Sequence, residues 1–284
     1  MLFKKQEILL FVIDYLHELN ITSKLYLEKV LFLLKEEYNI SKNIAYYNFY
    51  PYKYGPFSRL SYNDKCYLIK EELLNKNELE LTDKGKKYLK EKNIDYNSQL
   101  IDITNRFKNK KEILDYVYRV YPQFSKKSEL ETHKTQFKDP KIFTIGYEKK
   151  DIDYFLNQLI NEDIDIVIDV RKNPFSMNYT FIGKKLESAL TSDNTGIKYM
   201  HLPELGIDSE DRKDLKDLND YKKLFLEYEK TLIDKNKQEK LNEIINLGSK
   251  QRIALLCFEK DQKYCHRGVI ANYLRKKGFE VKDL

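Results

Sequence analysis

The sequence predicts an α/β fold for its second half, preceded by a mostly helical first half. A chain of 284 residues is long enough for two domains, each with its own core. From residue 141 onward, short apolar runs typical of buried strands alternate with segments whose apolar residues recur at helical spacing. This alternation indicates a parallel-type sheet with helices on both faces. We therefore expect a helical domain over 1–125 and an α/β domain over 141–284.

Residues 126–140 are expected to link the domains, because they hold several lysines and almost no apolar pattern. The chain has 51 basic and 45 acidic side chains and a formal net charge of +6. Residues 1–140 hold 25 of the basic and 20 of the acidic ones, so this part has a charge of +5 and the remainder +1. So mild a bias permits nucleic-acid binding without requiring it.

Cysteine content and hydropathy predict a cytoplasmic protein with reduced thiols and no membrane partner. Three cysteines, an odd number in a chain this long, do not form a disulfide framework. Charges interrupt the apolar stretch at residues 2–19, so it reads neither as a signal peptide nor as a membrane span of about 18 apolar residues.

Amphipathic helices are predicted in the first half over 6–19, 23–38, about 60–74 and about 97–121. Ser23 is the expected N-cap of the second helix, and Pro122 ends the last one. Residues 79–89, LELTDKGKKYL, read as a short strand that enters a Thr-capped helix. This pattern resembles the wing-to-helix segment of winged-helix proteins.

An aromatic, turn-rich segment precedes the third of these helices. Its residues 50–58, YPYKYGPFS, are similar to the signature of small helical domains of prokaryotic phage and toxin–antitoxin settings, the Panacea-like antitoxin domains. The resemblance covers about residues 1–120 and implies a nucleic-acid or protein partner. Alternatively, the aromatic residues form a small core under a long loop. The candidate partner-binding residues are Lys53, Tyr54, Arg59, Lys84, Lys86 and Lys87.

Strands in the second half are predicted over 141–147, 164–171, 198–206 and 252–259, with a fifth at 280–282. Helices are predicted over 151–160, 221–247 and 268–277. Polar residues with reactive side chains gather where the strands end, and the carboxyl ends of parallel strands are where ligands bind. The candidate catalytic residues are Asp169, Glu204, Cys257, Glu259, Cys265 and His266, and the candidate ligand-binding residues are Tyr147, Arg171, His201, Arg267 and Gly268.

Several motifs in this half together resemble one family. They are TIGY at 144–147, DVR at 169–171 with Pro174 and Ser176, HLPELG at 201–206, LLCFE at 255–259 and YCHRGVIA at 264–271. They resemble the family catalogued as domain of unknown function 488 over about residues 141–284. The resemblance implies an intracellular prokaryotic α/β domain and supplies no reaction.

Two chemistries lead among those open to these residues. Arg171 and Arg267 could hold a phosphate or carboxylate beside the helix N-terminus near Gly268, or could pair internally with Asp169 or Glu204. Alternatively, the order of elements is similar to that of rhodanese-like sulfurtransferases and their phosphatase relatives, with a thiolate at a helix N-terminus. The loop from Cys257 to Arg267 is longer than the Cys-x5-Arg phosphate cradle of that group.

Two further chemistries carry less weight. Cys257, Cys265, His266 and His201 could total four zinc ligands, but their spacing matches no standard zinc module, and the adjacent Cys265 and His266 are expected to point in different directions. We therefore predict no metal site. Asp169, Glu204 and Glu259 could supply a general acid or base, bind magnesium with substrate phosphates, or form salt bridges to the same arginines.

The sequence as a whole indicates an anion-binding site that acts on a nucleotide or nucleic-acid substrate, as a hydrolase or transferase. One alternative is a non-enzymatic regulator that senses a ligand, and another is a thiol enzyme that transfers sulfur. The sequence names no cofactor.

Overall fold

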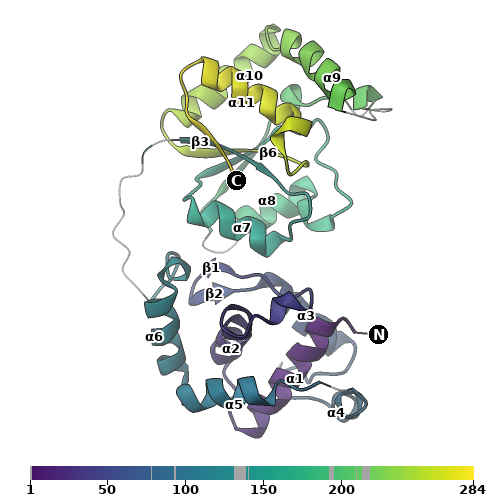
Figure 1. Ribbon diagram of the computed structural model, residues 1–284, viewed down its shortest axis with the longest axis vertical. Helices are drawn as coiled ribbons and strands as arrows, with labels where there is room; N and C mark the ends of the chain where they lie inside the picture. Colours follow the sequence, from purple (N-terminus) through teal and green to yellow (C-terminus); the bar gives the residue numbers. More distant parts are fainter. Residues whose placement is uncertain are drawn as a thin grey trace. The chain divides into compact units, whose positions relative to one another are not determined.

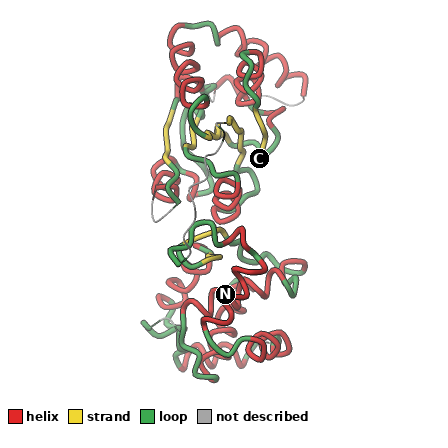
Figure 2. The backbone as a smooth tube through the Cα atoms, turned by 90° about the vertical axis from the view of Figure 1, so that its left-hand side faces the viewer, coloured by secondary structure: helices red, strands yellow, loops and turns green. Residues whose placement is uncertain are grey.

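The computed structural model describes residues 2–77, 79–92, 94–130, 139, 141–191, 195–208, 210–212 and 218–284. The chain divides into two compact units, Met1–His133 and Lys134–Leu284 (Figure 1). The first is mostly helical and the second contains the sheet, as the tube view of Figure 2 shows by its colours. No helix within the described ranges is long and apolar enough to cross a membrane.

Six α-helices and one β-hairpin build the described part of the first unit. The helices are α1 (Lys4–Glu18), α2 (Lys24–Glu36), α3 (Arg59–Lys70), α4 (Asp83–Lys90), α5 (Asn97–Arg106) and α6 (Lys110–Val120), and the hairpin strands are β1 (Tyr50–Tyr52) and β2 (Gly55–Phe57). Short 3-10 turns lie at Ile40–Lys42 and Pro122–Phe124. Ser23 caps α2, since its hydroxyl accepts from the Tyr26 amide.

The single helix predicted over 97–121 is two helices. Phe107 takes an extended conformation, and the Asn109 side chain accepts the amides of Lys111 and Glu112 as the N-cap of α6. A capping side chain competes with helix continuation, so the apolar spacing on both sides did not reveal the break. The strand predicted near residue 80 is one isolated bridge, Leu74 to Leu81. The winged-helix resemblance stays a prediction.

A five-stranded parallel sheet forms the centre of the second unit. Its strands β3 (Lys141–Gly146), β4 (Ile166–Asp169), β5 (Lys198–His201), β6 (Arg252–Cys257) and β7 (Val281–Asp283) lie in the order β5-β4-β6-β3-β7. Helices α7 (Ile152–Asn161) and α8 (Gly183–Thr191) lie on one side of the sheet, and α10 (Lys235–Gly248) and α11 (His266–Lys276) on the other (Figure 1). The predicted α/β class is confirmed.

Both faces of the sheet are buried. Ile142, Ile253 and Leu255 pack with the apolar residues of α10 and α11, while Phe143 and Leu256, which alternate with them, are buried as well. Strands covered on both faces read as continuous apolar runs, and such runs predicted the strands. The long helix predicted over 221–247 is again two, α9 (Leu218–Thr231) and α10, because Asp234 is extended between them.

The strand register determines which residues lie together at the carboxyl edge of the sheet. In this register Gly146 pairs with Cys257, and Asp169 pairs with His201 and with Leu256. Strands β5, β4, β6 and β3 therefore end side by side, and the residues that follow them share one edge of the sheet.

The segment after the first unit's last helix is bonded to that unit. The Glu129 amide donates to the Lys53 carbonyl at 2.8 Å, and the hydroxyls of Ser128 and Tyr118 are 2.6 Å apart. Within the linker predicted over 126–140, residues 131–138 and 140 lie outside the described residues.

Candidate functional site

Two thiols and one imidazole converge where β6 ends. Cys257 is the last residue of β6, Cys265 is the N-cap of α11, and His266 is the first residue of that helix. Both Sγ atoms and a ring nitrogen of His266 all lie within 4.8 Å of one another, and the three side chains are buried. The loop 258–264 thus returns the chain to the strand end from which it left.

The orientation of His266 is fixed from outside the cluster. Its Nε2 lies 2.8 Å from the carbonyl oxygen of Val170, directly after β4, and a carbonyl can only accept. Nε2 therefore carries a hydrogen, and Nδ1, which is 3.9 Å from the Sγ of Cys257, faces the thiols, where it can take up the proton that Cys257 loses on ionising. The ring of Tyr228, at 5.7 Å between centroids, packs edge-on against the imidazole.

The ionisation of the cluster follows from these contacts. A hydrogen bond from Cys265, helped by the neighbouring His266, lowers the pKa of Cys257 well below its ordinary value, although burial opposes this. Burial, and then the hydrogen bond to Cys257, raise the pKa of Cys265. Burial lowers the pKa of His266, but its interactions with Cys257 outweigh burial and the net pKa is raised. Of the two thiols, Cys257 is therefore the one that ionises first.

Glu259 completes the group on the loop side. The Cys257 thiol lies 3.3 Å from Oε2 of Glu259, to which it donates when protonated. Burial first, and then the nearby charge of Cys257, raise the pKa of Glu259. A negative charge at Cys257 and one at Glu259 thus disfavour each other.

A cavity of about 350 Å³ reaches Cys257. Its wall includes the rings of Tyr147 and Phe258, which lie edge to face with centroids 5.3 Å apart, and the exposed side chains of Phe175 and Met177. Aromatic and apolar walls with a few polar groups are typical of small-molecule sites.

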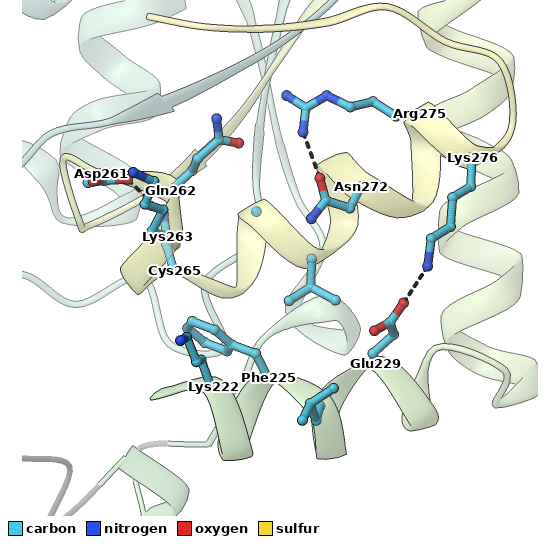
Figure 3. Close-up of a pocket in the computed structure, with 13 residues that line it drawn as sticks. Lys222, Phe225, Glu229, Asp261, Gln262, Lys263, Cys265, Asn272, Arg275 and Lys276 are labelled. Atoms are coloured by element: carbon cyan, nitrogen blue, oxygen red, sulfur yellow. Dashed lines mark hydrogen bonds and ion pairs between the residues drawn. The ribbon is translucent and has the colours of Figure 1, made fainter. Parts of the chain in front are cut away.

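A larger groove of about 810 Å³ reaches Cys265 from another side. Figure 3 shows Lys222 and Phe225 of α9 on one wall, and Lys263 and Cys265 near the start of α11 on the other. Gly268 also lines this groove, and a Cβ at that position would lie 2.4 Å from the Gln262 carbonyl oxygen. The two thiols are therefore reached from two separate cavities.

Asp169 and Arg171 form a buried pair beside this cluster. The guanidinium donates through Nε and Nη2 to the carboxylate, and through Nη1 to the Tyr147 hydroxyl at 2.9 Å and the Phe181 carbonyl at 3.0 Å. The Tyr147 ring stacks on Phe181 with centroids 4.3 Å apart. Arg171 thus binds within the protein, which is the internal alternative left open by the sequence.

Arg267 is fully buried and also binds internally. Its Nη1 and Nη2 donate to the carbonyls of Glu259 and Lys260, and Nη2 lies 3.7 Å from Asp283. A side chain committed in this way fixes the loop that carries Glu259. Both guanidinium groups thus bind atoms of the protein itself, and Arg171 also lines the cavity at Cys257.

Four amides of the loop are bonded to oxygens of the protein itself. The amide of Lys260 donates to Glu148, those of Lys263 and Tyr264 donate to Asp261, and that of Cys265 donates to Gln262. A phosphate cradle needs such N–H groups to point at the ligand. The extra length of the loop, noted from the sequence, is used in these internal turns.

The remaining predicted residues are divided between two places. His201 lies at the sheet edge beside Arg171, because its Nε2 is 2.8 Å from the Arg171 carbonyl oxygen. Glu204 lies apart and lines a different cavity with Lys172 and Lys237.

Sequence reasoning missed Tyr199, whose hydroxyl donates to Asp169 at 2.7 Å. Burial, and next the charge of Asp169, raise the pKa of Tyr199. Its spacing of two from His201, which puts both on one face of β5, is a signal that could have found it.

The donor set suits a soft divalent cation. The expectation that Cys265 and His266 point in different directions was wrong, because Cys265 is extended at the N-cap while His266 is already helical. The usual alternation of neighbouring side chains does not hold across such a junction. Within the described ranges, this is the one group of three or more His, Cys, Asp or Glu side chains whose ligand atoms converge.

In the first unit, the YPYKYGPFS segment organises a buried polar network. Lys29 of α2 donates to the Pro56 carbonyl at 3.0 Å, and Ser58 caps α3 by accepting the Ser61 amide. The Ser61 hydroxyl in turn donates to Glu28. Tyr46, Tyr47, Phe49 and Tyr50 are all buried. Tyr46, Tyr47 and Phe49 thus belong to the main core of the unit and not to a separate small one, while Tyr54 is exposed.

The predicted partner-binding residues of this unit occupy two places. Lys53, Tyr54 and Arg59 lie at the hairpin and the start of α3, where Lys53 is 3.4 Å from Glu129 and Tyr54 is exposed. Lys84, Lys86 and Lys87 lie on α4, where Lys84 donates to the Glu71 carbonyl and the other two are exposed.

Comparison with known proteins finds a match only within the second unit. No curated protein sequence and no solved structure matches the chain. One family model matches over residues 151–274, a range that runs from the N-cap of α7 into α11 and includes Asp169, Cys257 and His266. Residues 151–274 are thus similar to the family described as Domain of unknown function DUF488.

Proposed function

We propose that the second unit is a thiol-dependent group-transfer enzyme in which Cys257 is the nucleophile. The observation that carries this proposal is the position of His266, whose Nδ1 faces Cys257 while Nε2 is held by the Val170 carbonyl. A nucleophilic thiol paired with a base that a third group orients is the arrangement that covalent catalysis requires. The cavity beside Tyr147 gives a small substrate access to the sulfur.

The site favours sulfur transfer over phosphoryl transfer. Arg171 and Arg267 are bonded internally, and four amides of the loop donate to protein oxygens. A sulfane sulfur needs no such cradle. In the proposed step the Cys257 thiolate attacks the outer sulfur of a small persulfide, R–S–SH. The S–S bond breaks, R–S⁻ leaves with the electron pair, and Cys257 becomes a persulfide. An acceptor thiolate then attacks the outer sulfur of this persulfide, and the Cys257 thiolate is released.

The test is to incubate the reduced full-length chain with a small organic persulfide, and separately with an aryl phosphate. We expect one added sulfur on the peptide that contains Cys257, and no release of phosphate. Cys257→Ser should abolish the addition, while Cys66→Ser, which removes the exposed thiol of α3, should leave it intact. Turnover of the aryl phosphate by the parent chain, without modification of Cys257 by the persulfide, would contradict sulfur transfer and favour the anion-site alternative.

For the first unit we propose partner binding through the exposed part of α4. Lys86 and Lys87 are exposed on a short basic helix, and the unit holds most of the net positive charge of the chain. This arrangement is compatible with the phosphate backbone of a nucleic acid. The ligand-sensing regulator remains the alternative for the whole chain, and binding without turnover would favour it.

A further inference from the structure

We infer that Cys257, Cys265 and His266 form a binding site for one thiophilic divalent cation, of which Zn²⁺ is the natural example. The site uses residues of the proposed catalytic cluster and rests in part on that proposed function. A cation bound there would occupy the nucleophilic sulfur and hold the enzyme inactive.

The separations within the cluster suit a tetrahedral ion. Zinc lies about 2.3 Å from thiolate sulfur and about 2.0–2.1 Å from imidazole nitrogen, so tetrahedral ligand atoms are roughly 3.5–3.8 Å apart. The Sγ of Cys257 is 3.9 Å from Nδ1 of His266, and no pair in the cluster exceeds 4.8 Å. Small side-chain rotations of the cysteines therefore bring three ligands to one centre.

The surroundings of His266 match those of a metal-bound histidine. Such a ligand almost always donates its other ring N–H to a carboxylate or a backbone carbonyl, which fixes the tautomer. Here Nε2 donates to the Val170 carbonyl, and the packing of Tyr228 against the ring limits its rotation. Nδ1 is thus aimed at the thiols before any ion arrives.

The backbone around the cluster is equally fixed. Arg267 binds the carbonyls of Glu259 and Lys260, and the Glu259 carbonyl packs so closely on Gly146 that any Cβ there would collide with it. The Glu259 carboxyl lies 3.3 Å from the Sγ of Cys257 but is not among the ligand atoms that converge within 4.8 Å, so the protein supplies three ligands. The cavity at Cys257 and the groove at Cys265 give an ion two paths of entry.

Cobalt is the probe for this inference, because Co²⁺ takes tetrahedral zinc sites and its thiolate bonds absorb in the near ultraviolet. The reduced, chelator-treated full-length chain is titrated with Co²⁺ without oxygen. We expect one Co²⁺ per chain, with thiolate-to-cobalt absorption and strong visible bands, both erased when Zn²⁺ displaces the cobalt.

Matched variants locate the site. Cys265→Ser should remove about half of the thiolate absorption, and His266→Gln should weaken Co²⁺ binding by at least about tenfold while keeping that absorption. Cys66→Ser should change neither. Circular dichroism of each metal-free variant checks that it folds. The inference is overturned if no thiolate absorption develops, or if it survives the double change Cys257→Ser, Cys265→Ser.

The two proposals fail separately. A chain that binds no Co²⁺, yet takes sulfur from a persulfide at Cys257, overturns the metal site and leaves the proposed function standing. A chain that binds Co²⁺ through both thiols, but whose metal-free Cys257 takes no sulfur, supports the metal site and contradicts the proposed function.

Discussion

Arg171 and Asp169, two residues apart at the end of β4, form a buried ion pair in which Nε and Nη2 both donate to the carboxylate, at 2.8 and 2.5 Å. The pair lies between Tyr147 and Tyr199, whose hydroxyls bond to Arg171 and Asp169 respectively. This network joins the ends of β3, β4 and β5. It therefore supports the edge on which the thiol cluster lies.

Removal of Arg171 should destabilise the second unit. Arg171→Ala leaves the Asp169 carboxylate buried without its cation, which typically costs roughly 3–5 kcal/mol of unfolding free energy. Urea unfolding followed by circular dichroism measures the change. Arg119→Ala, at an exposed arginine of α6, is the control and should alter stability by less than about 1 kcal/mol. Equal effects of the two changes would show that the pair has no structural role.

Removal of Arg267 should loosen the loop 258–264. Its guanidinium holds the carbonyls of Glu259 and Lys260, so Arg267→Ala frees that backbone. Trypsin should then cut after Lys260 and Lys263 faster than in the parent chain. Arg275→Ala removes a guanidinium of the same helix that binds Asn272 and the Val281 carbonyl, and it should leave cleavage of the loop unchanged. Unaltered cleavage in Arg267→Ala would mean that other contacts fix the loop.

Lys29 should give the stability of the first unit a distinct dependence on pH. Burial lowers the pKa of Lys29 to about 8, whereas a lysine of the unfolded chain titrates near 10.4. Between these values the unfolded chain binds more protons, so the free energy of unfolding should rise with pH. Below about pH 8 both states are protonated and the cost of burying the charge applies in full.

The measurement for Lys29 is urea unfolding of the parent chain and of Lys29→Met, between about pH 7 and pH 9.5. The parent should gain stability relative to the variant as pH rises. Glu28, whose negative charge raises the pKa of Lys29, is present in both proteins, and Lys29→Met removes a charge that lowers the pKa of Glu28. A difference that stays constant with pH would contradict the lowered pKa.

Nucleic-acid binding by the first unit should depend on α4 and weaken with salt. Each lysine that contacts a phosphate releases counterions, so Lys86→Ala or Lys87→Ala should reduce the salt dependence of binding by about one ion. Fluorescence polarisation with labelled duplex and single strands at low salt measures this. Lys53→Ala should have a smaller effect, because Lys53 already pairs with Glu129. Absence of binding to every strand would leave a protein partner for this unit.

The sequence predicted the edge of the site better than its chemistry. Continuous apolar runs fixed strands such as β6, and parallel strands must end together, so Asp169 and Cys257 were expected on one edge. The sequence could not tell which groups bind one another. Arg267 turned to its own loop instead of outward, and the approach of Cys265 to His266 depends on the backbone bend at a helix N-cap. Residue spacing predicts neither the direction of the Arg267 side chain nor the approach of Cys265 to His266.

The reactivity of Cys257 tests whether this thiol is the nucleophile, and Cys66 is an internal control. Cys257 lines a cavity but is only 1 % exposed, whereas Cys66 is exposed on α3. At about pH 6.5 an ordinary exposed thiol is mostly protonated and reacts slowly. A thiolate paired with His266 reacts through the cavity despite its burial.

The measurement is labelling of the metal-free chain with iodoacetamide at that pH, followed by mass spectrometry of the two cysteine peptides. We expect Cys257 to be labelled before Cys66. His266→Gln should slow labelling of Cys257 by about 100-fold without changing the labelling of Cys66. Labelling of Cys66 first, with Cys257 modified only after denaturation, would contradict a nucleophilic role for Cys257.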